Sequence, residues 1–207
     1  EAGVDIKFDG SSVIINKGGC VVGVAFDDRW RTKHVIVDNL NDLWKLRGSK
    51  YTQSNLSDIF IQIKNLLKNE TQVLFSGTPC QVMGLRRYLR KDYPNLYTIE
   101  NICHGVASPI VWDEYLKEKL EQLGNNSATI NYVTFRDKSF GWSNYGLHVQ
   151  ALDINTGKYY EVIHNSNKND LFMRGFLNSL FTRPSCANCP ARHFKSNGDI
   201  TIGDCWG

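Results

Sequence analysis

The chain has 207 residues, of which 42% are hydrophobic and 22% are charged, and its formal net charge is +3. A chain of this length and composition can bury a sizeable core, which excludes disordered and fibrous proteins. The charge is spread without a basic stripe, and no apolar stretch reaches the length of a membrane span. Neither nucleic-acid binding nor a membrane crossing is therefore predicted.

The six cysteines are too sparse for a disulfide-stapled mini-domain, and no secretory signal pattern precedes them. The expected compartment is therefore the reducing cytoplasm, where clustered thiols indicate metal or redox chemistry more often than disulfides. The chain begins at Glu1 rather than at Met and ends at Gly207 directly after an apolar run. We therefore expect a core fragment of a longer protein.

The N-terminal third of the chain predicts short elements around one polar loop. A weakly extended segment is expected over Glu1–Lys17, followed by strands over Cys20–Phe26 and Lys33–Val37. A short helix is expected over Asp38–Leu46 and an amphipathic helix over Ile59–Leu67. Cys20 lies inside an apolar run, so core packing is its expected role. His34 is expected at a sheet edge or facing solvent.

The polar loop Arg47–Ser54 combines glycine, serine, threonine, two cations and an aromatic side chain. Cations and backbone N–H groups in such a loop can hold the phosphates of an anionic cofactor. Its composition also fits an ordinary polar connection between helices, so both interpretations stay open.

The segment Gln72–Gln81 predicts a strand, a tight loop and the start of a helix. The apolar run Val73–Phe75 is followed by Ser-Gly-Thr-Pro and then by Cys80, after which apolar residues recur at helical spacing. Sheets of α/β proteins bind ligands at the carboxyl ends of their strands, and a helix N-terminus favours a thiolate. An ordinary buried cysteine at a helix start fits the same pattern.

A second predicted strand, Leu96–Cys103, also ends on a thiol and continues into the small turn His104-Gly105. Ser108 and Pro109 then start a helix that runs to Gly124, with serine as the N-cap and proline at the first position. Because two strand ends each deliver a cysteine, a shared role for the two thiols is indicated.

The second half of the chain predicts a mostly extended region. A strand is expected over Thr129–Phe135, and a charged and aromatic turn over Arg136–Trp142. The two strands of a hairpin are expected over Leu147–Ile154 and Lys158–Ile163. A helix over Asp170–Leu180 and a short strand over Ile200–Ile202 follow. The predicted fold class is α/β, with a mixed, largely parallel sheet flanked by helices, an additional hairpin and a cysteine-containing C-terminal segment. All of it is expected to form one domain, 1–207.

The C-terminal segment carries the pair Cys186-x-x-Cys189, whose spacing lets two thiolates reach one metal ion or cluster. One hypothesis is a zinc site completed by His193 and Cys205, since zinc takes thiolates and imidazoles in a tetrahedron. Another is a metal-free redox pair, although no thioredoxin-like strand precedes it.

A third hypothesis is a [4Fe–4S] cluster bound by four thiolates, from Cys80, Cys103, Cys186 and Cys189. The positions of Cys80 and Cys103 at strand ends favour it, because a parallel sheet places those ends on the same side. Spacing alone does not separate the cluster from zinc, and six unrelated thiols remain the structural alternative.

Five motifs, in order and from about Cys20 to the end of the chain, resemble the coenzyme F420 hydrogenase/dehydrogenase beta-subunit family. They are GSKYTQS, SGTPCQVMGLRRYL, ICHGVASPIVWDEYL, TFRDKSFGW and RPSCANCPARHFKSNGDITIGDCWG. The resemblance implies an iron–sulfur flavoprotein oxidoreductase that moves electrons between FAD, a [4Fe–4S] cluster and a redox partner. In archaeal members the partner is the deazaflavin coenzyme F420, and a plant relative reduces a chlorophyll derivative, so the substrate here is not assigned.

Matched residue by residue, the resemblance implies that Cys80, Cys103, Cys186 and Cys189 are the cluster ligands. Cys205 falls where relatives have an aromatic residue, so it is expected to be a packed thiol, which weakens the zinc hypothesis. The residues expected to line FAD are Arg47, Gly48, Ser49, Lys50, Tyr51, Ser54, Thr78, Pro79, His104 and Gly105. Among them, Arg47, Lys50 and His104 are expected to stabilise the phosphates or the reduced flavin, and no catalytic acid or base is assigned.

The chain departs from its relatives at the N-terminus, where residues 1–19 do not match their Ser- and Gly-rich stretch. Many relatives also carry a ferredoxin-like module with its own cysteines upstream, and none is expected in this chain. The resemblance therefore implies that a redox partner protein or such a module works with this core, and that the core is unable to turn over alone. An oligomer is compatible with the sequence. A cluster-free or zinc-stapled docking subunit is the alternative function.

Overall fold

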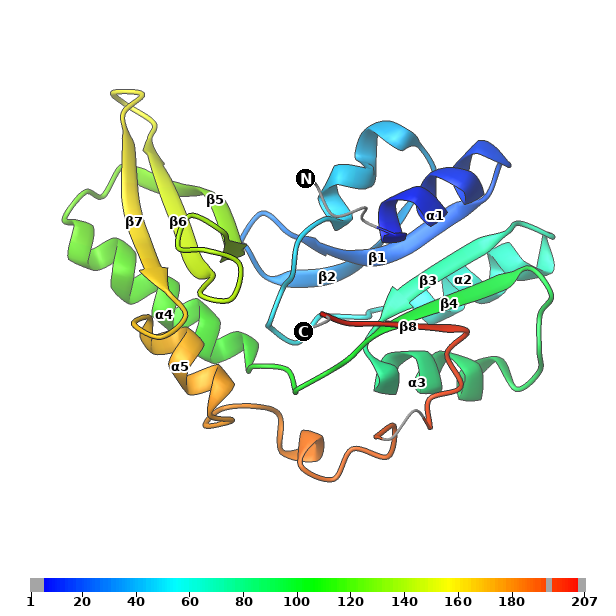
Figure 1. Ribbon diagram of the computed structural model, residues 1–207. Coiled ribbons are helices and arrows are strands. Elements are labelled where there is room, and N and C mark those ends of the chain that lie inside the picture. The colour runs from blue at the N-terminus through cyan, green and yellow to red at the C-terminus, as the bar shows by residue number, and fades with distance from the viewer. Residues whose placement is uncertain (1–5, 193–194, 205–207) are drawn as a thin grey trace.

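The computed structural model describes residues 6–192 and 195–204, and it contains two separate β-sheets (Figure 1). The five-stranded sheet has the order β2-β1-β3-β4-β8. Its strands are β1 (Cys20–Phe26), β2 (Thr32–Val37), β3 (Val73–Gly77), β4 (Leu96–Asn101) and β8 (Ile200–Ile202). Only β2 runs antiparallel to its neighbour, while β1, β3, β4 and β8 are parallel. The predicted mixed, largely parallel sheet is therefore confirmed.

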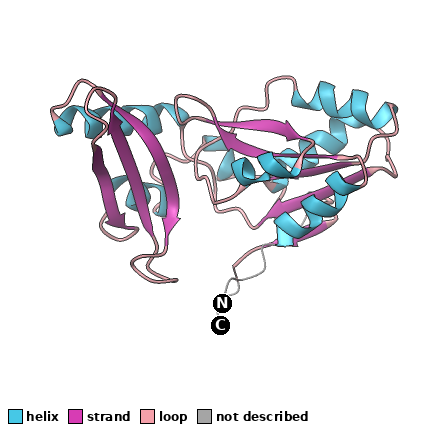
Figure 2. Ribbon diagram, turned by 90° about the horizontal axis from the view of Figure 1, so that it is seen from above, coloured by secondary structure: helices cyan, strands magenta, loops and turns pink. Residues whose placement is uncertain are grey.

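Helices cover both faces of this sheet (Figure 2). Side chains alternate along a strand, so Val22 faces the cluster formed with α2 (Ile59–Lys68) and α3 (Pro79–Leu89), while Val21 faces the opposite cluster. The second face is covered by α1 (Ile6–Asn16) and the 3-10 helix η1 (Leu40–Leu46). Nearly continuous apolar strands are typical of parallel sheets that are buried on both faces.

The second sheet is antiparallel and three-stranded, with the order β5-β6-β7. It consists of β5 (Ala128–Asp137), β6 (Gly146–Asp153) and β7 (Tyr159–Ser166), and the predicted hairpin is its β6–β7 pair. One face packs on α4 (Pro109–Leu123) and α5 (Leu171–Leu177) around the fully buried Trp112. Trp30, in the turn after β1, joins the two parts by donating from Nε1 to the Ile130 carbonyl at 3.0 Å.

The N-terminal prediction is wrong, because the segment expected to be extended forms α1. Its run of β-branched residues, Val13-Ile14-Ile15, has strand propensity, and that run misled the prediction. In the structure Ile14 and Ile15 pack against the cluster that includes Val21 and Leu74, so burial of one helix face outweighs the local preference.

Two predicted boundaries also shift. Arg136 and Asp137 were expected in a turn, but both lie within β5, which continues two residues past Phe135. Strand β4 ends at Asn101, so Cys103 lies just beyond the strand rather than at its last residue. Cross-strand hydrogen bonding, which the local pattern does not reveal, determines both ends. Of the described helices, none has the length and apolar character that crossing a bilayer requires.

His34 lies on the edge strand β2, as expected, but its side chain does not face solvent. It is buried, with its ring stacked on Phe75 at a centroid distance of 5.4 Å and its Nδ1 3.1 Å from the Ser54 hydroxyl. Burial lowers the pKa of His34 from 6.5 to about 4. The helices on this face and the Arg47–Ser54 loop cover the edge strand, which is why edge position did not imply exposure.

The buried His34 predicts an acid-sensitive step in stability. The unfolded chain takes up a proton near pH 6.5 while the folded chain resists protonation down to about pH 4, so stability falls as the pH drops through this window. Between pH 7 and pH 5 the free energy of unfolding should fall by about 2 kcal/mol from this residue alone. Urea unfolding at both pH values measures the loss in the wild type and in His34→Gln. An equal loss in the variant would contradict the prediction.

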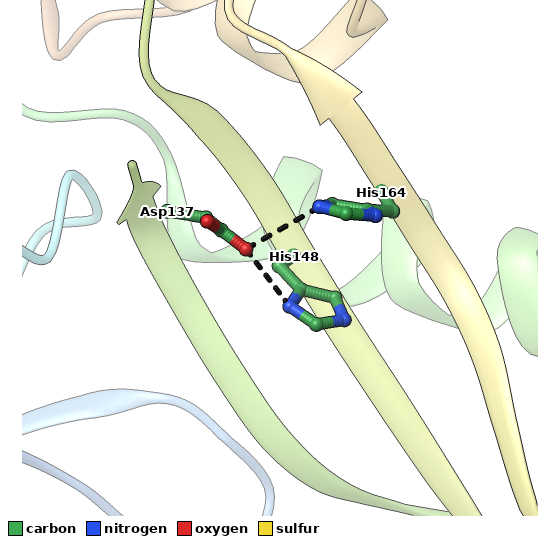
Figure 3. Close-up of side chains that lie close together, drawn as sticks. All are labelled: Asp137, His148 and His164. Atoms are coloured by element: carbon green, nitrogen blue, oxygen red, sulfur yellow. Dashed lines mark ion pairs between the residues drawn. The ribbon is translucent and has the colours of Figure 1, made fainter. Parts of the chain in front are cut away.

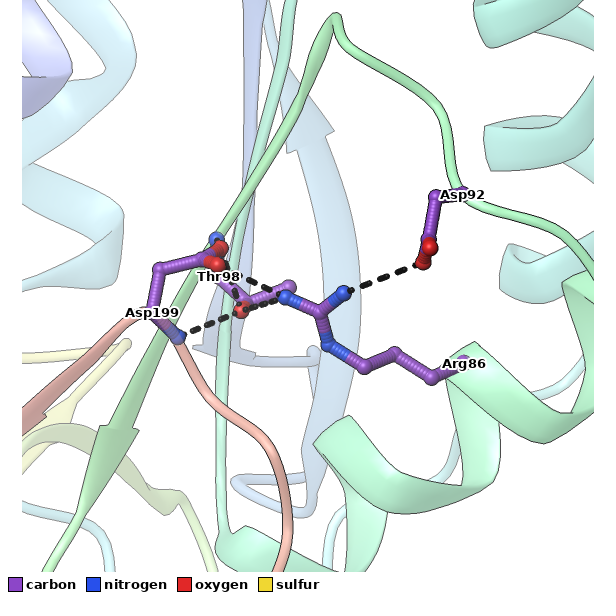
Figure 4. A network of polar contacts seen from close by, with 4 residues as sticks. All are labelled: Arg86, Asp92, Thr98 and Asp199. Carbon is purple, nitrogen blue, oxygen red and sulfur yellow. Dashed lines mark hydrogen bonds and ion pairs between the residues drawn. The ribbon is translucent and has the colours of Figure 1, made fainter.

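The short strand β8 is held to the sheet by a polar network around Asp199 (Figure 4). Asp199 Oδ2 accepts hydrogen bonds from the Thr98 backbone N–H and the Thr98 hydroxyl, both at 2.7 Å, and Oδ1 lies 2.8 Å from Arg86 Nη2. Thr98 is fully buried in β4, so this carboxylate satisfies groups that have no access to water. The network therefore ties the C-terminal segment to β4 and α3.

Replacing Asp199 by alanine should destabilise the protein by about 1–2 kcal/mol, because it leaves the buried Thr98 donors unsatisfied. Thermal unfolding measures this effect, and limited proteolysis reports whether the C-terminal segment is released. Asp92→Ala is the matched control. The Asp92 side chain is fully exposed and 3.9 Å from Arg86 Nη1, so it should change stability by less than about 0.5 kcal/mol. Equal effects of the two variants would refute the role given to Asp199.

Candidate functional site

Four thiols from three segments line a single cavity of about 280 Å³ at the carboxyl ends of β3 and β4. They belong to Cys80, Cys103, Cys186 and Cys189, the four cysteines expected to share a site. The cavity is lined further by Pro79, Glu100, Ile102, His104, Gly105, Val106, Ala191, Arg192 and Thr201. Side chains more than a hundred positions apart in the sequence thus meet at one end of the parallel sheet.

The first thiol is placed by a well-defined helix start. β3 ends at Gly77, Thr78 is the N-cap of α3, and Pro79 occupies its first turn, so Cys80 lies in that turn as well. Gln81 Oε1 accepts a hydrogen bond from the Thr78 N–H at 2.9 Å, and the Thr78 hydroxyl lies 3.3 Å from Cys80 Sγ. The first turn of α3 therefore fixes the position of the Cys80 thiol, which lines the cavity.

The second and third segments are aligned by backbone pairing next to the sheet. After β4 the chain runs through Cys103 to Ala107, which bridges Thr52 on one side and Thr182 on the other. The Arg183 N–H donates to the Val106 carbonyl at 3.0 Å. This pairing brings the 3-10 helix η2 (Pro184–Cys186) against the turn after Cys103.

Gly105 permits this close approach. Its φ is +153°, and a Cβ at this position would lie 3.1 Å from the Thr182 side chain and 3.7 Å from Cys186 Cβ. A larger residue would therefore push the C-terminal thiols away from Cys103.

Two arginines lie next to the thiols. Arg183 Nη2 lies 3.8 Å from Cys80 Sγ, and Arg192, which lines the cavity, donates from Nη2 to the Cys186 carbonyl at 3.2 Å. Burial, together with the nearby thiols of Cys80, Cys186 and Cys189, raises the pKa of Cys103 to about 11. A buried thiol placed beside three others fits a ligand that loses its proton when a metal binds.

The residues expected to line a flavin are only partly brought to this cavity. Pro79, His104 and Gly105 line it, and Thr78 contacts Cys80. His104 Nε2 lies 3.3 Å from the Phe176 carbonyl and 3.2 Å from the Ser179 hydroxyl, which holds the ring beside α5.

The other six expected flavin residues, all in Arg47–Ser54, do not line the cavity. Lys50 Nζ donates to the Arg47 carbonyl at 2.8 Å and to the Gly48 carbonyl at 3.2 Å, so the ammonium group folds onto its own loop. Tyr51 packs in the aromatic core of the second sheet. Ser54 accepts a hydrogen bond from Gln81 Nε2 at 2.9 Å, which connects the loop to the start of α3.

Glu100 also lines the cavity, a position that was not predicted from the sequence. Its side chain is 1% exposed, Oε1 accepts from the Thr201 hydroxyl at 3.0 Å, and Oε2 is buried without a hydrogen-bond partner among the described residues. The available signal was an acidic residue inside the apolar strand Leu96–Asn101, where charge is unfavourable unless it has a role.

The other two cysteines are Cys20, which the structure describes, and Cys205, which lies outside the described residues. Cys20 is buried in β1, as predicted, and burial raises the pKa of its thiol to about 11. Cys205 and His193, which the zinc hypothesis requires, both lie outside the described residues. The expected packing of Cys205 therefore stays a prediction.

The C-terminal two thirds of the chain are similar to a known protein family. Residues 70–207 match the family model that describes the C-terminal part of the beta subunit of coenzyme F420 hydrogenase/dehydrogenase. No curated protein matches the chain.

Among solved structures, the chain is similar to one from the xenon-derivatized F420-reducing [NiFe] hydrogenase complex of Methanosarcina barkeri. The TM-score is 0.49 at 15% identity, covering 89% of this chain and 58% of that chain. This chain thus spans little more than half the length of that one. The family match extends over both cysteine-bearing strand ends and the Cys-x-x-Cys pair, so this chain belongs to the coenzyme F420 hydrogenase/dehydrogenase beta-subunit family of oxidoreductases.

Proposed function

We propose that the chain is the electron-transfer core of an oxidoreductase subunit, binding one [4Fe–4S] cluster through Cys80, Cys103, Cys186 and Cys189. The observation that carries this proposal is the convergence of these four thiols on one cavity at the carboxyl ends of β3 and β4. Four cysteine thiolates are the usual ligand set of such a cluster, and a cavity of about 280 Å³ leaves space for a group of several atoms.

FAD is proposed beside the cluster, next to the Arg47–Ser54 loop and the turns at Thr78-Pro79 and His104-Gly105. The backbone bridge from Thr52 to Ala107 and the hydrogen bond from Gln81 to Ser54 support this placement, because they join the loop to both cysteine-bearing turns. When bound, FAD exchanges electron pairs with a substrate and the cluster accepts single electrons. The substrate is proposed to be a small molecule or a deazaflavin coenzyme of the F420 type.

The residues of the chain supply position and charge compensation. Cys80 and Cys103 come from ends of adjacent parallel strands, so the rigid sheet holds their spacing. Arg183 and Arg192 provide positive charge next to the thiolates, which favours a bound anionic group in a site partly shielded from water. Ile102, Val106 and Ala191 form the apolar part of the lining.

The protein is further proposed to act as a single cytoplasmic α/β redox domain, 1–207, with 183–207 as its C-terminal cluster-binding segment. A redox partner protein or a ferredoxin-like module is proposed to exchange electrons with it.

Anaerobic purification of the natural protein that contains this chain, followed by iron, sulfide, zinc and flavin analysis, tests the proposal. Four iron atoms and four acid-labile sulfides per chain, with retained FAD, are expected. A colourless protein with no iron would refute the cluster, and one zinc ion bound through thiolate sulfur would support a docking subunit. Iron without FAD retention, after FAD is added, would refute only the flavin part.

A further inference from the structure

The three-stranded sheet carries a polar cluster of Asp137, His148 and His164 (Figure 3) on the face that does not pack on α4 and α5. Asp137 Oδ2 lies 3.0 Å from His148 Nδ1 and 3.4 Å from His164 Nε2. One ligand atom from each of the three residues lies within 4.8 Å of the others. His148 and His164 are direct cross-strand partners in β6 and β7, and their rings stack at 4.4 Å.

A β-bulge in β5 brings Asp137 to this face. Thr134 pairs with His148 but Asp137 pairs with Gly146, so three steps along β5 oppose two along β6. Strict alternation from Thr134 would point Asp137 into the core. The extra residue instead puts Phe135 and Arg136 on the core side and returns Asp137 to the face of the histidines.

A second bulge does the same for Glu161. Val149 pairs with Ile163 but Gln150 pairs with Glu161, which leaves Val162 as the extra residue of β7. Glu161 therefore shares the face of His164, and its Oε2 lies 3.2 Å from His164 Nδ1 and 3.8 Å from His148 Nε2. Bulges re-aim side chains next to functional sites, and here two separate ones place carboxylates on either side of one histidine pair.

The arrangement matches the requirements of a borderline divalent cation. Two imidazoles and one carboxylate form a frequent ligand set for first-row transition metals, and they leave positions open for water or another ligand. Ligand atoms around a tetrahedral ion at 2.0–2.1 Å lie about 3.3 Å apart, close to the two Asp137 separations. The second carboxylate, Glu161, lies 3.2 Å from Nδ1 of His164, the ring nitrogen that does not face Asp137. Partners that orient a metal-ligating imidazole occupy this position.

The surroundings of the cluster limit the movement of its ligands. Phe140 packs against the His164 ring at 4.9 Å, and Tyr132 contacts the His148 ring edge-on at 5.5 Å. The Ser139 hydroxyl lies 3.0 Å from His164 Nε2. The backbone N–H of Ser139 donates to Asp137 Oδ1 at 2.7 Å. The donor atoms are thus held on ordered strands rather than on loose surface side chains.

We propose that Asp137, His148 and His164 bind one divalent first-row transition metal ion of the zinc class, with Glu161 orienting the histidines. This site is built entirely on β5–β7 and shares no residue with the cavity lined by the four cysteines. It does not depend on the function proposed above.

Titration of the tag-free full chain with Co²⁺ and Zn²⁺ tests the proposal. The background is the variant in which Cys80, Cys103, Cys186 and Cys189 are all serine, so that thiols do not compete. One equivalent should bind, with nitrogen and oxygen at about 2.0–2.2 Å in X-ray absorption and no sulfur at about 2.3 Å. If that background fails to fold, the same spectra are recorded on the wild type loaded with one further equivalent.

Single variants distinguish ligands from neighbours. Glu161→Gln should weaken Zn²⁺ affinity about 10–100-fold, and Asp137→Asn, His148→Gln or His164→Gln should weaken it more than that. Asp92→Asn makes the same chemical change as Asp137→Asn on a fully exposed carboxylate in the loop between α3 and β4, and it should leave affinity unchanged. Circular dichroism checks that each variant keeps its strands. No binding, or binding that the histidine variants leave unchanged, overturns the proposal.

Discussion

Replacing Cys80 by serine is expected to abolish cluster binding, with loss of the bound iron and of the visible absorbance that a [4Fe–4S] cluster confers. Cys80 Sγ is one of four thiols lining the cavity, and it is the one next to both Thr78 and Arg183. A serine hydroxyl is a far poorer ligand for iron than a thiolate, so the remaining three cysteines should not retain the intact cluster. Iron and sulfide analysis after anaerobic purification measures the loss, and Cys103→Ser should behave alike.

This variant also separates the cluster from zinc. A zinc site made by Cys186, Cys189, His193 and Cys205 does not include Cys80, so Cys80→Ser should leave zinc content unchanged if that hypothesis is right. Cys20→Ala is the control, since Cys20 is buried in β1 and does not line the cavity. Full iron content in Cys80→Ser would refute the proposed ligand set, and iron loss in Cys20→Ala would show that a general destabilisation is responsible.

Trp112→Ala is expected to lower the free energy of unfolding by about 3–5 kcal/mol. Trp112 is 0% exposed and contacts the rings of Phe135 and Phe172 at centroid distances of 4.8 and 5.0 Å. Its Nε1 donates to the Trp30 carbonyl at 2.9 Å, which links α4 to the turn after β1. Alanine would leave a large cavity and an unpaired carbonyl at the junction of the two sheets. Denaturant unfolding measures the change.

Ile110→Ala is the control on the same helix. Ile110 is 72% exposed, so its replacement should change the unfolding free energy by no more than about 0.5 kcal/mol. If Trp112→Ala does not fold, Trp112→Phe keeps most of the volume and should lower stability by about 1–2 kcal/mol through the lost hydrogen bond. A loss for both Trp112 variants no larger than that for Ile110→Ala would disprove the central role of Trp112.

The prediction of α/β architecture and of a shared thiol site followed from local signals. The runs at Cys20–Phe26 and Val73–Phe75 are apolar on both faces, as parallel strands between helices must be. Thr78-Pro79 and Ser108-Pro109 are helix starts by their own chemistry, and both precede helices in the structure. Because the two thiols follow strands of one parallel sheet, their proximity could be predicted without knowing the rest of the fold.

Other features depend on partners distant in the sequence. Burial of Ile14 and Ile15 against the sheet turned a segment of strand propensity into α1, and coverage of β2 buried His34. The pairing of Thr52 with Ala107 and of Ala107 with Thr182 brings the polar loop and the C-terminal cysteines together. Neither of these two pairings leaves a periodic signal, since each joins single residues outside the named strands.

The sequence by itself determined which segments form most of the strands and helices and that Cys80 and Cys103 each follow a predicted strand, because apolar periodicity and capping act over a few residues. Only the tertiary structure decided that Glu100 lines their cavity and that Asp137 and Glu161 share a face with His148 and His164. The direction of a strand side chain depends on the register with the neighbouring strand, and a one-residue bulge reverses it. A bulge is a mismatch between two paired strands, so the residues of one strand alone do not reveal it.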